Sequence, residues 1–97
     1  MEKTARRRQI DPDRIRDAII ALCTARGVDK SICPSEVARA LDGEAWRSHL
    51  SRVRSVAADL ARQGRIDILR KGKPIDPDRV KGVIRLRLSA TDANRTD

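Results

Sequence analysis

The first clear hydrophobic pattern in the chain predicts a helix from about residue 12 to residue 26. Apolar side chains recur three and four residues apart, which places them on one helical face: Ile15, Ala18, Ile19, Leu22 and Cys23. Asp11 is suited to cap this helix, Pro12 to occupy its first position and Gly27 to end it. Cys23 is then a small core residue.

A second, shorter helix is predicted over residues 34–41. The residue before Pro34 is pushed towards extended geometry, so residues 31–33 are expected to form a brief link or very short strand. Cys33 falls at the helix cap, and Glu36 can reach back to it from the third helical position. Such a short helix is the usual lead-in of a helix-turn-helix.

A third and longer helix is predicted over residues 45–63. Its apolar positions form a sustained stripe: Trp46, Leu50, Val53, Ala57 and Leu60. At about 100° per residue, other side chains fall opposite or beside this stripe. Those opposite are Ser48, Ser51, Arg52, Ser55, Asp59 and Arg62, with Arg47 and Arg54 on one flank. We interpret Trp46 as a core anchor rather than a partner-facing aromatic, and His49 as a partly buried neutral histidine.

Beyond Gly64 the hydrophobic period changes from helical to alternating, which predicts two β-strands, residues 65–70 and 83–88. In the first strand, Ile66 and Ile68 are predicted to face inward. The second strand divides into two faces, with Ile84, Leu86 and Leu88 inward and Arg85 and Arg87 outward. Together the strands predict a hairpin.

The tip of this hairpin, residues 71–82, is predicted to be a long basic loop because it is too long for a two-residue turn. Within it, Ile-Asp-Pro-Asp-Arg-Val at residues 75–80 echoes Ile-Asp-Pro-Asp-Arg-Ile at residues 10–15. Both stretches offer a cap, a proline at the first helical position and a hydrophobic staple. We therefore predict a single helical turn near residues 77–80.

Charge is distributed unevenly, and this makes the third helix and the hairpin a candidate binding surface. Residues 46–88 carry twelve Lys and Arg against four acids, whereas residues 11–45 carry five against seven. A basic face on a helix followed by a hairpin is what a protein that binds nucleic acid presents to phosphates.

Composition excludes several classes of function. Trp46 is the single aromatic residue, which removes the stacking platforms of single-strand binders. Two cysteines are too few for a disulfide framework, and one histidine gives no zinc site. We expect no cofactor and no enzymatic activity, since no catalytic cluster or Gly-rich phosphate loop is present. With no apolar run long enough for a membrane and no secretory signal, a cytoplasmic protein without membrane contact is expected.

The two ends of the chain are predicted to lie outside the folded domain of residues 11–88. Residues 1–10 form a basic tail with Arg6, Arg7 and Arg8 in a row. This tail is either a solvated terminus or an arm that enters a nucleic-acid groove. Residues 89–97 are polar and predicted to be disordered.

The order of helix, short link, helix, long helix and hairpin resembles the winged-helix variant of the helix-turn-helix. The fold class is α+β, mainly α. Several short strings also resemble a bacterial family catalogued as domain of unknown function 3253: ICPSEVARAL at residues 32–41, Trp46-Arg47, Val53-Arg54, Gly64-Arg65-Ile66 and Lys71-Gly72-Lys73-Pro74. This second resemblance spans roughly residues 13–88.

The resemblance implies a winged-helix fold: three helices, a two-stranded hairpin as the wing, and a very short first strand near residues 31–33. It implies no substrate, catalytic residue or ligand, because the family has none assigned. A functional expectation has to come from the residues themselves, since a fold does not determine a function.

From the charged surface we expect a protein that binds double-stranded DNA, with a regulatory role in transcription. The third helix would enter the major groove and the wing would touch backbone or minor groove. The candidate residues are Arg47, Ser48, Ser51, Arg52, Arg54 and Ser55 on the helix, Arg70, Lys71 and Lys73 at the tip, and Arg85 and Arg87 on the second strand. Most of the affinity would come from phosphates and depend strongly on salt.

Two alternatives remain open from the sequence. The first is a protein-interaction module that docks an acidic partner, for which the same basic face is suited. The second is recognition of double-stranded RNA by shape, which the lack of aromatic residues does not exclude. The oligomeric state also stays open between a monomer and a weak dimer.

Overall fold

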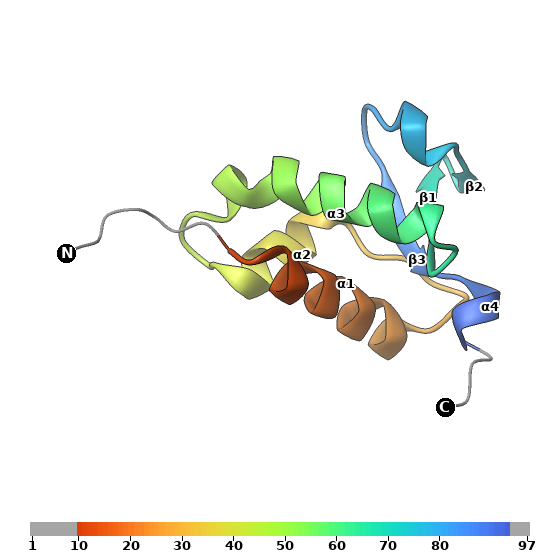
Figure 1. The fold of residues 1–97 in the computed structure, drawn as a ribbon, viewed down its shortest axis with the longest axis horizontal. Coiled ribbons are helices and arrows are strands. Elements are labelled where there is room, and N and C mark those ends of the chain that lie inside the picture. The colour runs from red at the N-terminus through yellow and green to blue at the C-terminus, as the bar shows by residue number, and fades with distance from the viewer. Residues whose placement is uncertain (1–9, 94–97) are drawn as a thin grey trace.

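The computed structural model describes residues 10–93, which form an α+β fold that is mainly helical (Figure 1). Three helices come first: α1 (Pro12–Arg26), α2 (Pro34–Leu41) and α3 (Leu50–Arg62). A three-stranded antiparallel sheet follows, in the order β2-β1-β3: β1 (Ile66–Arg70), β2 (Lys73–Pro74) and β3 (Arg85–Leu88). No helix within residues 10–93 is long and apolar enough to cross a membrane. The expectations for residues 1–9, Arg6–Arg8 among them, and for residues 94–97 lie outside the described residues.

Helix α1 begins and ends where the sequence predicts. The Asp11 carboxylate accepts a hydrogen bond from the Asp13 N–H at 2.9 Å. At the other end Gly27 takes a φ of +95°, and its N–H donates to the Cys23 carbonyl at 3.0 Å. Burial raises the pKa of the Cys23 thiol to about 11, in keeping with a core residue. The buried face is the predicted one, with Ile15, Ile19 and Cys23 inside.

The third predicted helix starts differently, because its first turn is a 3-10 helix, η1 (Trp46–His49), and the α-helix begins only at Leu50. Asp42 accounts for this start. Its Oδ1 accepts from the N–H groups of residues 44 and 45, at 3.2 and 3.1 Å, and its Oδ2 lies 3.0 Å from His49 Nε2. The bond from residue 45, followed by the His49 ring, holds the pKa of the Asp42 carboxyl below its usual range. His49 is buried, as predicted, and Asp42 is the partner that the sequence did not reveal.

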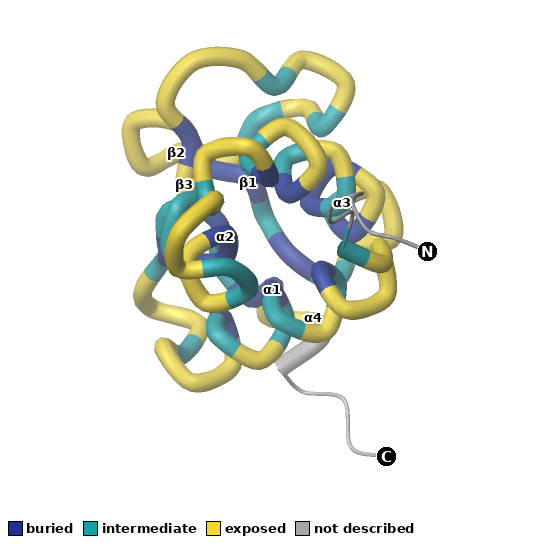
Figure 2. The backbone as a smooth tube through the Cα atoms, turned by 90° about the vertical axis from the view of Figure 1, so that its left-hand side faces the viewer, coloured by how far each residue is buried: buried dark blue, intermediate teal, exposed yellow. Residues whose placement is uncertain are grey.

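The core is aliphatic and lies between the helices and one face of the sheet (Figure 2). Ile66 lies opposite Leu88 and Ile68 opposite Leu86, so all four side chains share the core face. Helices α1, α2 and α3 contribute Ile15, Ile19, Val37, Val53, Ala57 and Leu60.

The link at residues 31–33 contributes one β-bridge. The N–H groups of Ile32 and Leu86 each donate to the other residue's carbonyl, both at 2.8 Å. Ile32 is fully buried. The predicted very short strand is therefore a bridge of one residue, which attaches the α1–α2 connection to β3.

The prediction of two strands joined by one long loop, with no tight turn, was wrong at the hairpin tip. Strand β1 ends in a two-residue turn, Lys71-Gly72, and β2 pairs back on it with Arg70 opposite Lys73. Lys71 has a φ of +54° and Gly72 a φ of +81°. Two positive φ angles are what a two-residue hairpin turn of the mirror-image type requires. The prediction failed because it took residues 71–82 as one loop, although the glycine of Lys71-Gly72 was a signal for this turn.

The helical turn predicted inside the tip is confirmed as η2 (Pro77–Arg79). The Asp76 carboxylate accepts from the Asp78 N–H at 2.9 Å. This is the bond that Asp11 makes with the Asp13 N–H at the start of α1, so the two similar stretches share one local structure.

The end of the described chain is packed against the α3–β1 connection. Ser89 is buried; its hydroxyl donates to the Gly64 carbonyl at 2.8 Å and its N–H to the Arg65 carbonyl at 3.1 Å. A one-turn helix, α4 (Ala90–Ala93), follows. Residues 89–93 are therefore ordered, within the segment predicted to be a disordered tail.

A polar network joins the end of α1, the start of α2 and β3. The Arg26 guanidinium donates to the Glu36 carboxylate at 2.6 Å and to the Ser31 carbonyl at 3.1 Å. Glu36 also accepts from the Cys33 N–H at 2.9 Å, as predicted for its position in α2. Arg85 donates to the Ser31 hydroxyl and carbonyl at 2.9 and 2.8 Å.

The tight turn predicts that Gly72→Ala destabilises the protein, because an L side chain is strained at a φ of +81°. We expect a loss of roughly 1–2 kcal/mol in the free energy of unfolding, measured by chemical denaturation. Gly43→Ala is the matched control, since a Cβ at either glycine meets nothing within 4 Å and Gly43 lacks a positive φ. Equal losses for the two variants would contradict the turn.

The Glu36 network predicts a specific pH dependence. The Cys33 N–H, and after it the Arg26 guanidinium, lower the pKa of Glu36 from its ordinary value of 4.5. A carboxyl group whose pKa is lowered on folding stabilises the fold at pH values above its unfolded-state pKa. This contribution is lost as the pH falls through its folded-state pKa. The stability advantage of the native protein over Glu36→Gln should thus be full at pH 7 and shrink below pH 4.5. The measurement is the thermal unfolding midpoint as a function of pH, with Glu44→Gln as the control for removing one negative charge. A stability advantage over Glu36→Gln that stayed constant with pH would refute the prediction.

Candidate nucleic-acid interface

The outward face of η1 and α3 exposes the side chains that the sequence placed there. These are Arg47, Ser48, Ser51, Arg52 and Ser55. The Ser48 hydroxyl donates to the Ala45 carbonyl at 2.7 Å, so it is engaged within the first turn. The Arg52 side chain makes no ion pair or hydrogen bond with another described residue, which leaves its guanidinium available to an anion.

Trp46 combines the two interpretations that the sequence allowed. It is half-buried and packs against the core cluster. Two guanidinium carbons also lie over its ring, that of Arg39 at 4.3 Å and that of Arg47 at 4.4 Å from the centroid. Cation–π attraction holds both cations beside η1. Arg39, from α2, thereby joins the candidate surface, although the sequence analysis had not selected it.

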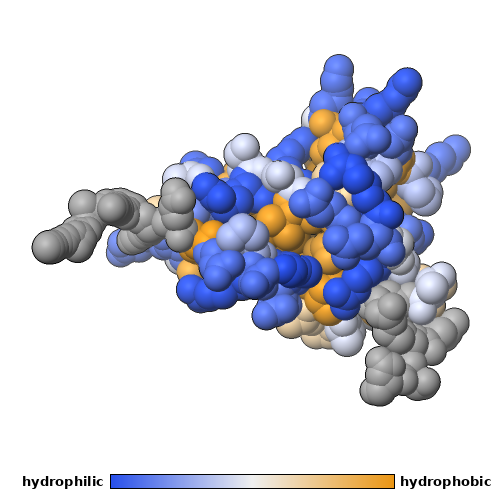
Figure 3. Space-filling model, viewed as in Figure 1, coloured by the Kyte–Doolittle hydropathy of each residue, from blue (hydrophilic) through white to orange (hydrophobic). Residues whose placement is uncertain are grey.

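The second group of cations lies at the tip, where hydrophilic side chains cover the upper right of the molecule (Figure 3). Arg70, Lys71 and Lys73 are exposed there, as predicted. Arg79 and Lys81, on the returning chain, are exposed as well and were missed as site residues. The sequence contained a signal for these two residues. The helical turn predicted at residues 77–80 uses its acid and its proline for local structure, which leaves the basic side chains in and after the turn free to point outward.

Two arginines of α3 hold the returning chain of the tip. The Arg62 guanidinium pairs with the Asp78 carboxylate at 2.8 Å and with Asp59, one turn earlier on α3, at 2.7 Å. Arg54 donates to the Gly82 carbonyl at 3.0 Å. The tip therefore lies along the C-terminal part of α3, as Figure 1 shows. Arg54, selected as a binding residue, is half-buried and makes an intramolecular contact.

The two strand arginines are also engaged within the protein. Arg87 donates to the Asp67 carboxylate at 2.8 Å, and these residues face each other across the β1–β3 pair. Arg85 is bound to Ser31 through two hydrogen bonds. Both guanidinium groups stabilise the sheet and its connections, whereas the cations at the tip have no such role.

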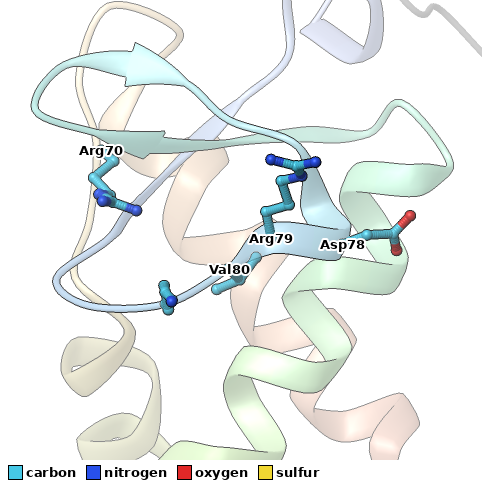
Figure 4. Close-up of a pocket in the computed structure, with 5 residues that line it drawn as sticks. Arg70, Asp78, Arg79 and Val80 are labelled. Carbon is cyan, nitrogen blue, oxygen red and sulfur yellow. The ribbon is translucent and has the colours of Figure 1, made fainter.

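An open hollow of about 550 Å³ lies between the β1–β2 hairpin and the returning chain. Its lining residues are Arg70, Asp78, Arg79, Val80 and Lys81. Figure 4 shows Arg70 entering from the hairpin and Arg79 from η2. The Asp78 side chain points away from them, towards α3, where Arg62 holds it. The hollow therefore gathers positive charge from two segments of the tip.

The remaining candidate groups have local structural roles. Both cysteines are free thiols; Cys23 is buried, and Cys33 accepts a hydrogen bond from the Ser35 hydroxyl at 3.1 Å. Within residues 10–93, no three His, Cys, Asp or Glu side chains come together in a way that could hold a metal ion. The notable chemistry of the described surface is thus its concentration of cations.

Comparison with known proteins places the chain in a family. No curated protein matches the sequence. A family model does match, over residues 12–89, and its description is protein of unknown function (DUF3253). The matched region begins with the first residue of α1 and ends at the buried Ser89, so it contains α1, α2, α3 and the sheet. The chain therefore belongs to the DUF3253 family of proteins of unknown function.

Proposed function

We propose that this protein binds double-stranded DNA, with the β-sheet and its tip acting as the wing of a winged helix. The observation that carries the proposal is a group of exposed cations at the tip whose side chains make no ion pair or hydrogen bond with another described residue: Arg70, Lys71, Lys73, Arg79 and Lys81. Phosphate groups are the natural partners of such a group, and they supply most of the affinity in DNA binding.

The two acids of the tip form no ion pair with these five cations. The Asp76 carboxylate caps η2 by accepting the Asp78 N–H, and the Asp78 carboxylate is bound by Arg62. Neighbouring like charges repel one another, and an anionic partner relieves that repulsion. The tip is therefore built as an electropositive surface, with its acids used for local structure.

In this proposal the tip contacts the DNA backbone and α3 approaches the major groove. Ser51 and Ser55 are small and allow close approach, and Arg52 can donate to a phosphate or to a guanine edge. Arg54 would position the tip, and Arg85 and Arg87 would maintain the sheet. In this proposal Arg54, Arg85 and Arg87 no longer contact the DNA, whereas Arg79 and Lys81 are added to the contacts predicted from the sequence.

One observation favours a second candidate function, the docking of an acidic protein. Val83 is 84% exposed and directly follows the tip. An exposed apolar side chain beside a group of cations suits a protein partner that offers both carboxylates and an apolar contact. The DNA contacts proposed above do not involve Val83, so Val83→Ser separates the two functions. It should leave DNA affinity unchanged and weaken a protein complex.

Titration of a random-sequence duplex against salt tests the DNA proposal. The native protein should bind at about 20 mM salt and lose affinity linearly in a log–log plot. Arg52→Ala combined with Lys71→Ala should lower the affinity and reduce the slope by about two, because each lost phosphate contact releases about one counterion fewer. Fluorescence anisotropy of labelled DNA measures both quantities.

The control carries Arg14→Ala and Lys30→Ala, two exposed cations on α1 and in the loop after it that make no ion pair with another described residue. It changes the net charge equally and should leave the slope almost unchanged. Undetectable binding at about 20 mM salt would exclude DNA as the partner. Equal slopes for the two double variants would exclude the proposed surface.

A further inference from the structure

We propose that the hollow of the tip is a phosphate site, in which Arg70, Arg79 and Lys81 together hold one phosphodiester group of the bound duplex. This inference rests on the proposed DNA binding and assigns its principal backbone contact to a defined place. It also gives a role to Arg79 and Lys81, which the sequence analysis did not select.

The donors come from both sides of the hollow. Arg70 is the last residue of β1, Arg79 ends η2, and Lys81 follows on the returning chain. Two guanidinium groups and one ammonium group supply more N–H donors than one phosphate group can accept. Charge-assisted bonds from such donors are shorter and stronger than neutral ones. The arrangement therefore suits an anionic tetrahedral group with several oxygen acceptors.

The surrounding contacts position the two backbone segments that carry these donors before any ligand binds. The two-residue turn and the pairing of Arg70 with Lys73 set the hairpin side. On the other side, Asp78 is bound by Arg62, and the Gly82 carbonyl by Arg54, so α3 holds the chain that carries Arg79 and Lys81. Donors held in place by their backbone lose less entropy on binding than donors on a free loop.

The charge of the hollow is left uncompensated by the same contacts. Asp78 is the one acid among the lining residues, and its carboxylate is bound to Arg62 outside the cationic group. Val80 contributes an apolar wall. Three cations around one space repel one another, and a bound phosphate converts that repulsion into attraction. A single phosphate site therefore explains why these three cations are gathered with no carboxylate paired to them.

The test is the same duplex titration with two double variants. The hollow variant carries both Arg79→Ala and Lys81→Ala, and the control carries both Arg14→Ala and Lys30→Ala. Both pairs remove two exposed cations, and thermal melting checks that each variant is folded. We expect the hollow variant to bind about tenfold more weakly than the control at moderate salt, with a log–log slope smaller by about one, because one phosphate contact is lost. If the native protein binds DNA and the two variants bind equally, the phosphate site is overturned while the proposed function stands.

A second arm uses inorganic phosphate and detects the arginine side chains by their Nε–H resonances in NMR. We expect saturable shifts at Arg70 and Arg79 and none at Arg14, relative to chloride at equal ionic strength. If duplex binding fails but these shifts saturate, the site is a phosphate site whose ligand is a free phosphorylated molecule, and DNA is rejected as the source. Shifts that do not saturate, or that appear equally at Arg14, overturn the site.

Discussion

The register of β1 against β3 is the constraint on which the rest of the structure depends. Ile68 lies opposite Leu86, and both are buried on the core face of the sheet. Because side chains alternate along a strand, a slip by one residue would carry Asp67 or Arg87 into an aliphatic core at a large cost in free energy. The native register instead pairs these two charges on the outer face. It also fixes where β1 ends, and therefore where the tip begins.

From that sheet the tip is built by local turns and by one ion pair that spans the sequence. The Lys71-Gly72 turn and η2 form from neighbouring residues, whereas the Arg62–Asp78 pair brings the tip onto α3. Exposed ion pairs contribute little to stability. The main consequence of this pair is electrostatic, because it binds the carboxylate nearest to the hollow and leaves the surrounding cations uncompensated.

The sequence predicted those parts of the fold that depend on short-range chemistry. The helices, the alternation of the strands and η2 follow from caps, prolines and hydrophobic spacing. The roles of particular arginines could not be predicted in this way, because Arg54 bonds to Gly82 and Arg85 to Ser31 across long separations in the chain. The sequence does not distinguish an arginine that binds a ligand from one that donates to a carbonyl within the protein. The sequence therefore located the basic region, while the structure was needed to show which of its cations are engaged within the protein and which are not.

The most direct test of this division is an NMR spectrum of the arginine Nε–H groups recorded as duplex DNA is added to the intact protein. Binding through α3 and the tip predicts shifts at Arg52, Arg70 and Arg79, while Arg85 and Arg87 keep their resonances because they stay bound to Ser31 and Asp67. Shifts at Arg85 and Arg87, with Arg70 and Arg79 unchanged, would contradict the account.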